Sequence, residues 1–368
     1  MLRCEIEKNL KGFSLKVAIH AAAGVTALMG ASGSGKSMTL RCIAGVSRPD
    51  RGHISLNGKV LFDSAKKINL PPQQRNTGFL FQDYALFPNM TVLRNIMAGS
   101  KAKTARERQA AAREIARTFH VDAHLDKYPH QLSGGEKQRC ALARILIGSP
   151  DILMLDEPFT ALDSHLRWEL EMELSALFKN FSKPVLYVSH NRDEVYRLCS
   201  DIAVIHGGES AAPADKWTLF KNPLTVQAAR LTGCKNIAEA RVTARDNGTF
   251  VAVPAWGVEF TLAGERRDVY YAGIRANYIV PASAAQAEDI AASFAFEIVD
   301  EIEDTFTTIL MVRKRGTELP PIRWEMRKKD REALRNAPQE LALLKEHILL
   351  LKQEARNGQN SGIHQRQC

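Results

Sequence analysis

An eight-residue segment rich in glycine constrains the fold of this chain more than any other feature. Its residues are Gly30, Ala31, Ser32, Gly33, Ser34, Gly35, Lys36 and Ser37. The segment fits the pattern GxxxxGK[ST], follows an apolar run at 25–29 directly, and precedes a helical pattern that begins at Ser37. A strand, a glycine-rich loop and a helix in this order predict a loop that binds phosphate at the N-terminus of a helix.

The residue types of this segment suit that chemistry. Glycines allow backbone conformations in which successive N–H groups turn inward and bind phosphate oxygens. Lys36 is expected to reach the β- and γ-phosphates of a nucleotide, and the Ser37 hydroxyl is expected to ligate Mg²⁺. The alternative is a glycine-rich turn that arose by chance, which the flanking strand and helix disfavour.

Two acidic residues follow a second apolar run, at 152–155. Asp156 and Glu157 would lie at the carboxyl end of a strand, where α/β folds bind their ligands. Asp156 suits the water shell of Mg²⁺, and Glu157 is placed to polarise an attacking water as a general base. An acidic pair after a strand is by itself more often a strand end capped by the next helix. Its occurrence with the phosphate loop favours the functional interpretation.

The chain is organised as two regions of different pattern. Short apolar runs such as 152–156 and 185–189 are typical of buried parallel strands, and the helical patterns between them predict an α/β fold. We expect this first domain to span 1–232, with a helical subdomain at about 88–150. A β-rich domain is expected at 233–355, followed by a polar tail at 356–368.

Composition limits the other classes of protein. No run approaches the roughly 18–20 apolar residues of a membrane span, and charged residues at the start of the chain argue against a signal peptide, so we expect a cytosolic protein. The six cysteines are scattered, which is typical of reduced, packed thiols. The net charge of +9 could serve nucleic acid or acidic lipid, but the densest basic stretch, 101–117, has the pattern of a solvated helix face.

A third motif identifies a family. Residues 132–136 read Leu-Ser-Gly-Gly-Glu and are followed by Lys137, Gln138 and Arg139, a segment that resembles the signature motif of ABC-type ATPases. The motifs lie in the family's order across about 160 residues. The resemblance implies a P-loop ATPase domain, with ATP and Mg²⁺ as ligands.

The resemblance also implies roles for further residues. Gln82 matches the glutamine that contacts Mg²⁺ and water and couples to the membrane subunit. Asp163 matches the D-loop aspartate, and His190 matches the switch histidine that contacts the γ-phosphate. By resemblance, Ser133, Gly134 and Gly135 point the positive end of a helix at the γ-phosphate held by the opposite subunit. Because the chain holds one copy of each motif, this arrangement requires a homodimer.

Three positions depart from the family's pattern or leave a question open. Met38 stands where many relatives have a hydroxyl residue, although its backbone N–H can still bind phosphate. Cys140 stands where an aliphatic residue is usual, and a buried thiol is a tolerable substitute. Phe13 is the nearest candidate for an aromatic residue that stacks on adenine, and it fits equally well as an inward-facing strand residue.

The β-rich region resembles the small OB-like, TOBE-type domain of importer ATPases for oxyanions, sugars, polyamines and ferric iron. Within that group, the segments 56–63 and 71–75 resemble molybdate importer ATPases most, with sulfate importers close behind. The resemblance implies an integral membrane permease as partner, and indirectly an extracytoplasmic substrate-binding protein, at the cytoplasmic face of the cell (inner) membrane. Lys235 and Arg275 are candidates for a regulatory oxyanion site, and a solvated surface is at least as good an interpretation.

Two alternatives remain. The first is an importer ATPase for another substrate, such as ferric iron, a polyamine or a sugar, in place of molybdate, tungstate or sulfate. The second is an ABC ATPase that acts on nucleic acid or ribosomes. Such relatives usually carry tandem ATPase units or a long coiled coil before the signature, and the segment between Gly35 and Pro129 is too short for such a coil. We therefore expect an importer ATPase with no nucleic-acid partner.

Overall fold

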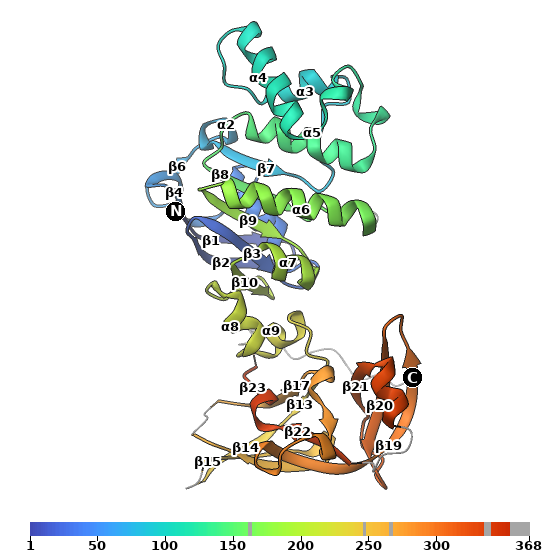
Figure 1. Ribbon diagram of the computed structural model, residues 1–368. Coiled ribbons are helices and arrows are strands. Elements are labelled where there is room, and N and C mark those ends of the chain that lie inside the picture. The colour runs from blue at the N-terminus through green and yellow to red at the C-terminus, as the bar shows by residue number, and fades with distance from the viewer. Residues whose placement is uncertain (161–163, 246–247, 265–267, 335–339, 354–368) are drawn as a thin grey trace. The chain divides into compact units, whose positions relative to one another are not determined.

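The structure of the chain is a computed structural model that describes residues 1–160, 164–245, 248–264, 268–334 and 340–353 (Figure 1). By its internal contacts the chain divides into two compact units, Met1–Trp217 and Thr218–Cys368. No helix in the described ranges is both long enough and apolar enough to span a bilayer.

The first unit is built on one large sheet. Its strands are β1 (Leu2–Leu10), β2 (Phe13–Ala21), β3 (Gly24–Met29), β4 (Arg51–Leu56), β5 (Lys59–Asp63), β6 (Ile68–Asn69), β7 (Thr77–Leu80), β8 (Ile152–Asp156), β9 (Pro184–Val188), β10 (Asp201–His206), β11 (Glu209–Ser210) and β12 (Ala214–Asp215). They are ordered β6-β5-β4-β1-β2-β11-β10-β3-β9-β8-β7, with β12 paired to β10. Between β10 and β7 all neighbours are parallel, whereas β1 pairs antiparallel with β2 and β4.

This strand order positions the site. Strands β8 and β9 are buried along their whole length, as continuous apolar runs require. Because β3, β9 and β8 are parallel neighbours, their carboxyl ends lie at one edge of the sheet. The segments that follow these three strands are therefore brought together.

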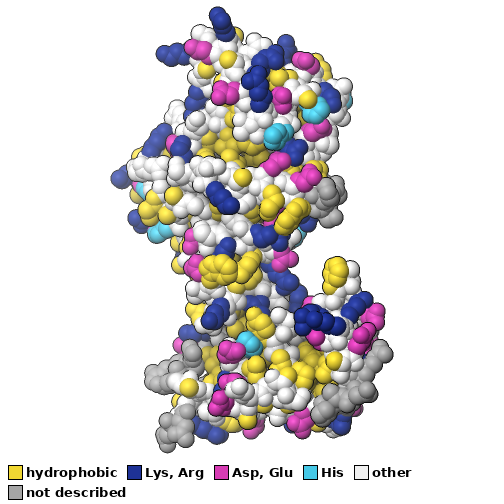
Figure 2. All heavy atoms as spheres, viewed as in Figure 1, with side chains coloured by type: hydrophobic (Ala, Val, Ile, Leu, Met, Phe, Trp, Pro, Cys, Tyr) yellow, Lys and Arg dark blue, Asp and Glu magenta, His cyan; other side chains and the backbone are white. Residues whose placement is uncertain are grey.

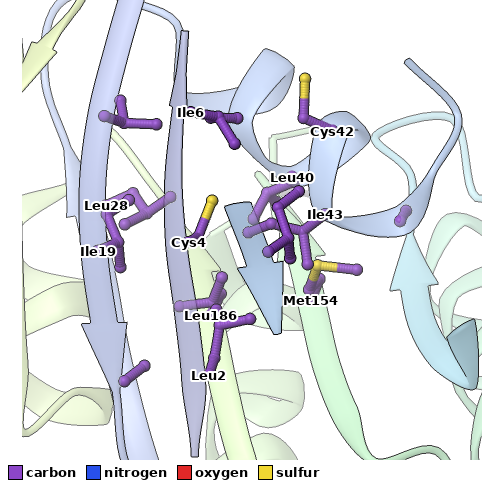
Figure 3. Close-up of a cluster of buried hydrophobic side chains, with 14 of the residues drawn as sticks. Leu2, Cys4, Ile6, Ile19, Leu28, Leu40, Cys42, Ile43, Met154 and Leu186 are labelled. Atoms are coloured by element: carbon purple, nitrogen blue, oxygen red, sulfur yellow. The ribbon is translucent and has the colours of Figure 1, made fainter. Parts of the chain in front are cut away.

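Helices cover this sheet and extend beyond it. They are α1 (Lys36–Ala44), α2 (Pro72–Arg75), α3 (Val92–Ala98), α4 (Ala105–Thr118), α5 (Gly134–Leu146), α6 (Ser164–Asn180) and α7 (Arg192–Leu198). Helix α8 (Lys216–Lys221) crosses from the end of the first unit into the second. Helix α1 is held from two sides: Leu40, Cys42 and Ile43 lie in one buried cluster with residues of β1 and with Met154 of β8 (Figure 3). Burial of the Leu40 and Ile43 side chains contributes about 1.5–3 kcal/mol each, so the helix that follows the phosphate loop is firmly anchored.

Helices α3, α4 and α5 form a separate cluster next to the edge strand β7 (Figure 1). Helix α4 begins with a capping box, in which Thr104 and Glu107 satisfy each other's backbone N–H groups. It buries Ala112 and Ala116 and leaves its Arg side chains exposed. Figure 2 shows Lys and Arg side chains gathered over this helical part of the surface. The basic stretch at 101–117 thus contains a helix with a solvated charged face.

The second unit is rich in strands. They are β13 (Asn236–Glu239), β14 (Arg241–Arg245), β15 (Gly248–Val253), β16 (Val258–Leu262), β17 (Tyr271–Ile274), β18 (Val280–Pro281), β19 (Ile290–Glu303), β20 (Thr307–Lys314), β21 (Ile322–Arg327), β22 (Glu340–Leu344) and β23 (Leu349–Leu351). They form sheets of order β13-β17-β23, β14-β15-β16 and β18-β22-β19-β20-β21. Trp324 lies in their shared core, where its indole N–H donates to the Ile279 carbonyl at 2.9 Å.

The predicted fold class is confirmed: an α/β unit with a phosphate loop precedes a β-rich unit. The apolar pattern at 278–280 predicts a strand within the β-rich region, and the structure corrects this prediction. Ala276–Tyr278 is a 3₁₀ turn in which the Tyr278 N–H donates to the Arg275 carbonyl, and only Val280–Pro281 is a strand. Lys345–His347 is also a 3₁₀ turn, and the ring of His347 stacks on that of Tyr278 with the ring centres 4.1 Å apart.

Two further helices lie in the second unit, α9 (Val226–Leu231) and α10 (Lys328–Ala333). Val226 and Ala229 of α9 pack against Cys234, Leu349 and Leu351, so α9 belongs with this unit by its contacts. The domain boundary expected between 232 and 233 stays a prediction, and the tail at 356–368 lies outside the described residues.

Candidate functional site

The glycine-rich segment forms a loop between β3 and α1. Gly33 and Gly35 have φ angles of 75° and 106°, in the left-handed region that favours glycine. Gly35 is the N-cap of α1, and a Cβ atom on it would lie 2.3 Å from Cδ1 of Leu15. The loop thus packs closely against β2 and leads into the start of α1, where the free N–H groups and the helix dipole favour an anion.

Lys36 is held back inside this loop. Its Nζ donates to the carbonyl oxygens of Gly30 and Ala31, each at 2.8 Å, and the residue is only 5% exposed. Burial lowers the pKa of Lys36, and the charges of Glu157 and Asp156 act in the opposite direction. A buried ammonium bonded to neutral carbonyls gains strongly from a nearby phosphate. The geometry is that of a cation ready to exchange carbonyls for phosphate oxygens.

The other loop residues differ in exposure. Ala31 and Ser32 are exposed, whereas Ser34 is buried and its hydroxyl has no hydrogen-bond partner in the described part of the chain. Met38 lies in the first turn of α1 and packs against the core of the first unit. A buried hydroxyl without a partner is costly unless a ligand or water satisfies it.

Ser37 and Asp156 meet across the site. The Ser37 hydroxyl donates to Oδ1 of Asp156 at 2.8 Å, which joins the start of α1 to the end of β8. Burial is the main cause that raises the pKa of Asp156, and the hydrogen bond from Ser37 lowers it. A hydroxyl and a carboxylate are oxygen donors of the kind that Mg²⁺ prefers beside phosphates. These two residues therefore fit a Mg²⁺ site.

Glu157 and His190 lie next to each other after β8 and β9. Nδ1 of His190 is 3.5 Å from Oε1 of Glu157, and the His190 side chain is 65% exposed. The backbone of Glu157 has a positive φ of 48°, and its N–H donates to the Val188 carbonyl at 3.0 Å. A non-glycine residue in this conformation at the end of a strand is typical of a functional position. Glu157 is held there with its carboxylate beside the loop of Lys36.

The sequence motifs did not identify Glu194 of α7, which holds the segment directly before His190. Its buried carboxylate accepts hydrogen bonds from Ser189 Oγ at 2.7 Å and from Tyr187 Oη at 3.0 Å. Ser189 in turn accepts the N–H of Asn191 at 2.9 Å. The segment that carries His190 is thus tied to α7. The acidic first turn of α7 after an Asn N-cap was the only signal in the sequence.

The signature segment forms the N-terminus of α5. Ser133 is the N-cap, and its N–H and hydroxyl form a capping box with Glu136. Gly134 begins the helix, and a Cβ on Gly135 would lie 3.0 Å from the side chain of Leu166. Close packing against α6 therefore explains the second glycine, and the helix presents its positive end at Ser133.

The structure brings only part of the predicted set together. Lys36, Ser37, Asp156, Glu157 and His190 gather at the carboxyl edge of β3, β8 and β9. Gln82 lies exposed in the turn after β7. Within the described residues no hydrogen bond joins Gln82, Ser133, Gly134 or Gly135 to that group, and Asp163 lies outside the described residues. The roles assigned to all these residues stay predictions.

Phe13 lies at the rim of the loop. It opens β2, is partly buried, and its Cζ would lie 3.3 Å from a Cβ placed on Gly35. The ring therefore lies beside the phosphate loop while packing on the core of the unit. Both interpretations of Phe13, an adenine platform and a strand residue, are compatible with this place.

Arg275 and Lys235, the candidates for an oxyanion site in the second unit, differ from each other in their contacts. The guanidinium of Arg275 donates to the carbonyl oxygens of Thr232 and Phe220 and to the Thr232 hydroxyl. These donors are thus used at the C-terminal ends of α8 and α9. Lys235 is exposed. A regulatory oxyanion site at these residues stays a prediction.

Comparisons with known proteins agree with this geometry. The sequence profile described as ABC transporter matches residues 10–160. The chain is 43% identical over 223 residues to the molybdenum import ATP-binding protein ModC of Paramagnetospirillum magneticum, a match that covers 61% of each protein. It is 38% identical over 258 residues to the protein of the same name from Rhodospirillum rubrum, covering 69% of this chain and 70% of that protein. The first match thus spans less than two thirds of its relative's length.

Solved structures give a second comparison. The chain is similar to the dimeric ATP-binding cassette MJ0796 in a post-hydrolysis state bound to ADP and Pi, with a TM-score of 0.50 and 26% identity. The similarity covers 58% of this chain and 98% of that protein. A second dimeric structure of the same cassette matches equally well.

Proposed function

Since the chain belongs to the ABC transporter family, we propose that it is the ATP-binding and ATP-hydrolysing subunit that drives an importer. One observation carries the proposal: Lys36, Ser37, Asp156, Glu157 and His190 converge on the loop at the N-terminus of α1. The set contains a phosphate-binding cation, oxygen donors for a metal ion and a carboxylate beside a histidine. These are the parts that phosphoryl transfer to water needs.

Each residue has a definite task in this proposal. The loop N–H groups and Lys36 bind the β- and γ-phosphates of ATP. Glu157 accepts a proton from the attacking water while the water oxygen bonds to the γ-phosphorus and the bond to ADP breaks, which yields ADP and phosphate. His190, held 3.5 Å from Glu157, contacts the γ-phosphate and orients the water.

Ser37 and Asp156, together with Gln82, would hold Mg²⁺, which neutralises charge on the phosphate oxygens when it is bound. The hydrogen bond between Ser37 and Asp156 already places these two oxygen donors side by side.

The proposed functional unit is a homodimer. Each motif occurs once in the chain, and the similar cassette MJ0796 is dimeric. The N-terminus of α5 at Ser133 would act on the γ-phosphate bound by the partner subunit, and Asp163 is assigned the D-loop role by resemblance alone. Two ATP molecules are then buried between two chains, and their hydrolysis lets the chains separate.

The proposed partners are integral membrane permease subunits, and indirectly an extracytoplasmic binding protein. The chain would work at the cytoplasmic face of the membrane. The proposed substrate is molybdate or a related oxyanion such as tungstate or sulfate. The names of the similar proteins from P. magneticum and R. rubrum support this choice.

Uptake measurements test the proposal. Deletion of the gene should abolish high-affinity accumulation of molybdenum, measured by mass spectrometry of washed cells at limiting molybdate. The intact gene should restore accumulation, and a gene with Glu157→Gln should not. If uptake of iron, a polyamine or a sugar is lost instead, that compound is the substrate in place of molybdate. If all uptake is unchanged and the chain copurifies with ribosomes or DNA, the importer proposal fails.

A further inference from the structure

One contact that the proposed chemistry leaves unused runs from helix α5 to the loop after Gln82. Arg144, near the end of α5, donates from Nη1 to the Ala85 carbonyl at 2.7 Å and from Nη2 to the Tyr84 carbonyl at 2.9 Å. Its Cζ lies 5.3 Å from the centre of the Phe87 ring. A planar guanidinium with two hydrogen bonds and a ring contact fixes both the position and the orientation of a segment.

The segment needs such support, because its backbone is strained. Tyr84 and Ala85 have φ angles of 61° and 44°, and two successive residues with a Cβ rarely adopt the left-handed region. Asn95 of α3 provides a second support: its side chain bonds both the N–H and the carbonyl of Phe87. The loop is therefore held in this shape by α3 and α5.

Arg144 is itself well placed for this task. Within the described residues it makes no ion pair, so its charge is devoted to the loop. Helix α3 ends at Gly99, which approaches so closely that a Cβ on it would lie 1.8 Å from the Arg144 carbonyl oxygen. The backbone of Arg144 is thus packed tightly against α3. A displacement of the loop that keeps its hydrogen bonds to Arg144 must therefore displace α5 as well.

We propose that Arg144 is a positioning residue that makes helix α5 and the Gln82 loop move as one body. Ser133, the N-cap of α5, lies about three turns or 16 Å before Arg144 along the helix. Motion of Ser133 toward nucleotide on the partner subunit then pulls the carbonyls of Tyr84 and Ala85, and with them Gln82. The inference rests on the proposed function for the roles of Gln82 and Ser133, whereas the mechanical link itself rests on the contacts of Arg144.

Amide hydrogen exchange of the full-length protein tests the link directly. Arg144→Met should accelerate exchange at 84–88 by at least about tenfold, since both carbonyls lose their donor. Arg144→Lys keeps the charge but lacks the fork, and should give an intermediate acceleration. Arg113→Met, on the exposed face of α4, is the matched control and should leave exchange at 84–88 unchanged.

Kinetics supply the second readout. The Kd for a non-hydrolysable ATP analogue should stay within about twofold of the wild type, because the Lys36 loop lies outside the contacts of Arg144. The kcat for ATP should fall at least about tenfold in Arg144→Met, as Gln82 loses its placement. The partial rescue by Arg144→Lys should appear in kcat as well.

Three results would overturn the link. The first is unchanged exchange at 84–88 in Arg144→Met. The second is equal acceleration throughout α3 and α5, which would mean that Arg144 only stabilises the helices. The third is a normal kcat despite a loosened loop. Wild-type protein without ATPase activity would instead refute the proposed function, and the exchange data would still decide the link.

Discussion

At the residue scale, Asp156 illustrates a conflict between folding and chemistry. It is 5% exposed at the end of β8, and its surroundings satisfy the carboxylate only in part, through Ser37. Burial therefore raises the pKa of Asp156 in the folded chain. The charge that would bind Mg²⁺ is carried at a cost in stability as long as no cation is bound.

This conflict predicts the effect of Asp156→Asn on the nucleotide-free protein. A carboxyl group with a raised folded pKa destabilises the fold above that pKa, and the penalty vanishes below the ordinary pKa of an aspartate, where both states are protonated. Asp156→Asn should therefore raise the melting temperature at pH 7, and the gain should shrink as the pH falls toward about 4 and be absent below it. The variant should gain little further stability from Mg-ATP. Thermal unfolding against pH, with Asp122→Asn as an exposed control, decides the matter, and a lower melting temperature at pH 7 would contradict it.

The role proposed for Glu157 predicts a variant that binds ATP but does not hydrolyse it. Glu157→Gln removes the proton acceptor but keeps the shape and the hydrogen bond from Thr160 to the backbone carbonyl. The kcat for ATP should fall by about 10²–10⁴, the usual contribution of a general base. ATP affinity should persist, so the variant should accumulate as a dimer in size-exclusion chromatography with ATP. Glu114→Gln on α4 serves as control, and brisk hydrolysis by Glu157→Gln would remove Glu157 from its role.

At the element scale, the helix that follows the phosphate loop depends on a buried cation at its other end. Arg75 is 1% exposed, and it donates to the carbonyls of Cys42 and Ile43 at 2.8 and 2.9 Å and to the Leu70 carbonyl at 2.8 Å. These bonds cap the C-terminus of α1, where the dipole favours a positive charge. Gly45 makes room for the side chain, since a Cβ there would lie 2.6 Å from Nε of Arg75.

We predict that Arg75→Met destabilises the first unit by about 2–4 kcal/mol, since three buried carbonyls lose a donor. The measurement is the urea concentration at which half of the first unit is unfolded. The slope of the unfolding free energy against urea concentration should not change. Gly45→Ala should act in the same direction, because the added methyl group meets the guanidinium and the φ of Gly45 is 81°. Arg48 is exposed and lies just after the end of α1, so Arg48→Met should change the midpoint little. Equal effects of Arg48→Met and Arg75→Met would contradict the capping role.

The elements of the first unit were predictable because their signals are local. Strands β8 and β9 are continuous apolar runs, and α1 follows a motif that requires a helix at that place. The capping of α1 by Arg75 was not predictable, since the Cys42 and Ile43 carbonyls that it binds lie more than thirty residues away in the sequence. The same holds for Arg144 and its loop. In the second unit, the turn at Tyr278 replaces an expected strand because a local N–H to carbonyl bond prevails over the apolar pattern.

In the candidate site, too, the features that local motifs encode were predictable and the contacts between distant side chains were not. Parallel strands place Ser37, Asp156 and His190 at one edge, so their proximity could be argued from strand order once the motifs were recognised. The contact between Lys36 and the loop carbonyls, and the support of His190 by Glu194, depend on side-chain conformations that no motif encodes.

At the scale of the whole molecule, the separation of Ser133 from Lys36 is the informative feature. Within the described residues no hydrogen bond joins α5's N-cap to the loop of the same chain, and each motif occurs once. If two chains share each ATP, a defect at Lys36 in one chain and a defect at Ser133 in its partner fall in the same composite site. The opposite site of that mixed dimer is then intact.

A mixing experiment therefore tests the shared site. Ser133→Asp keeps an N-cap acceptor for α5 while it places a negative charge against the γ-phosphate, and Lys36→Ala removes the phosphate-binding cation. Each variant alone should hydrolyse almost no ATP, whereas an equal mixture should recover up to about a quarter of wild-type activity, because half of the dimers are mixed and each has one intact site. Ser133→Asn keeps the cap without the charge and should lose much less activity. If both residues act on ATP within one chain, no mixture can contain an intact site, and the recovered activity will be nil.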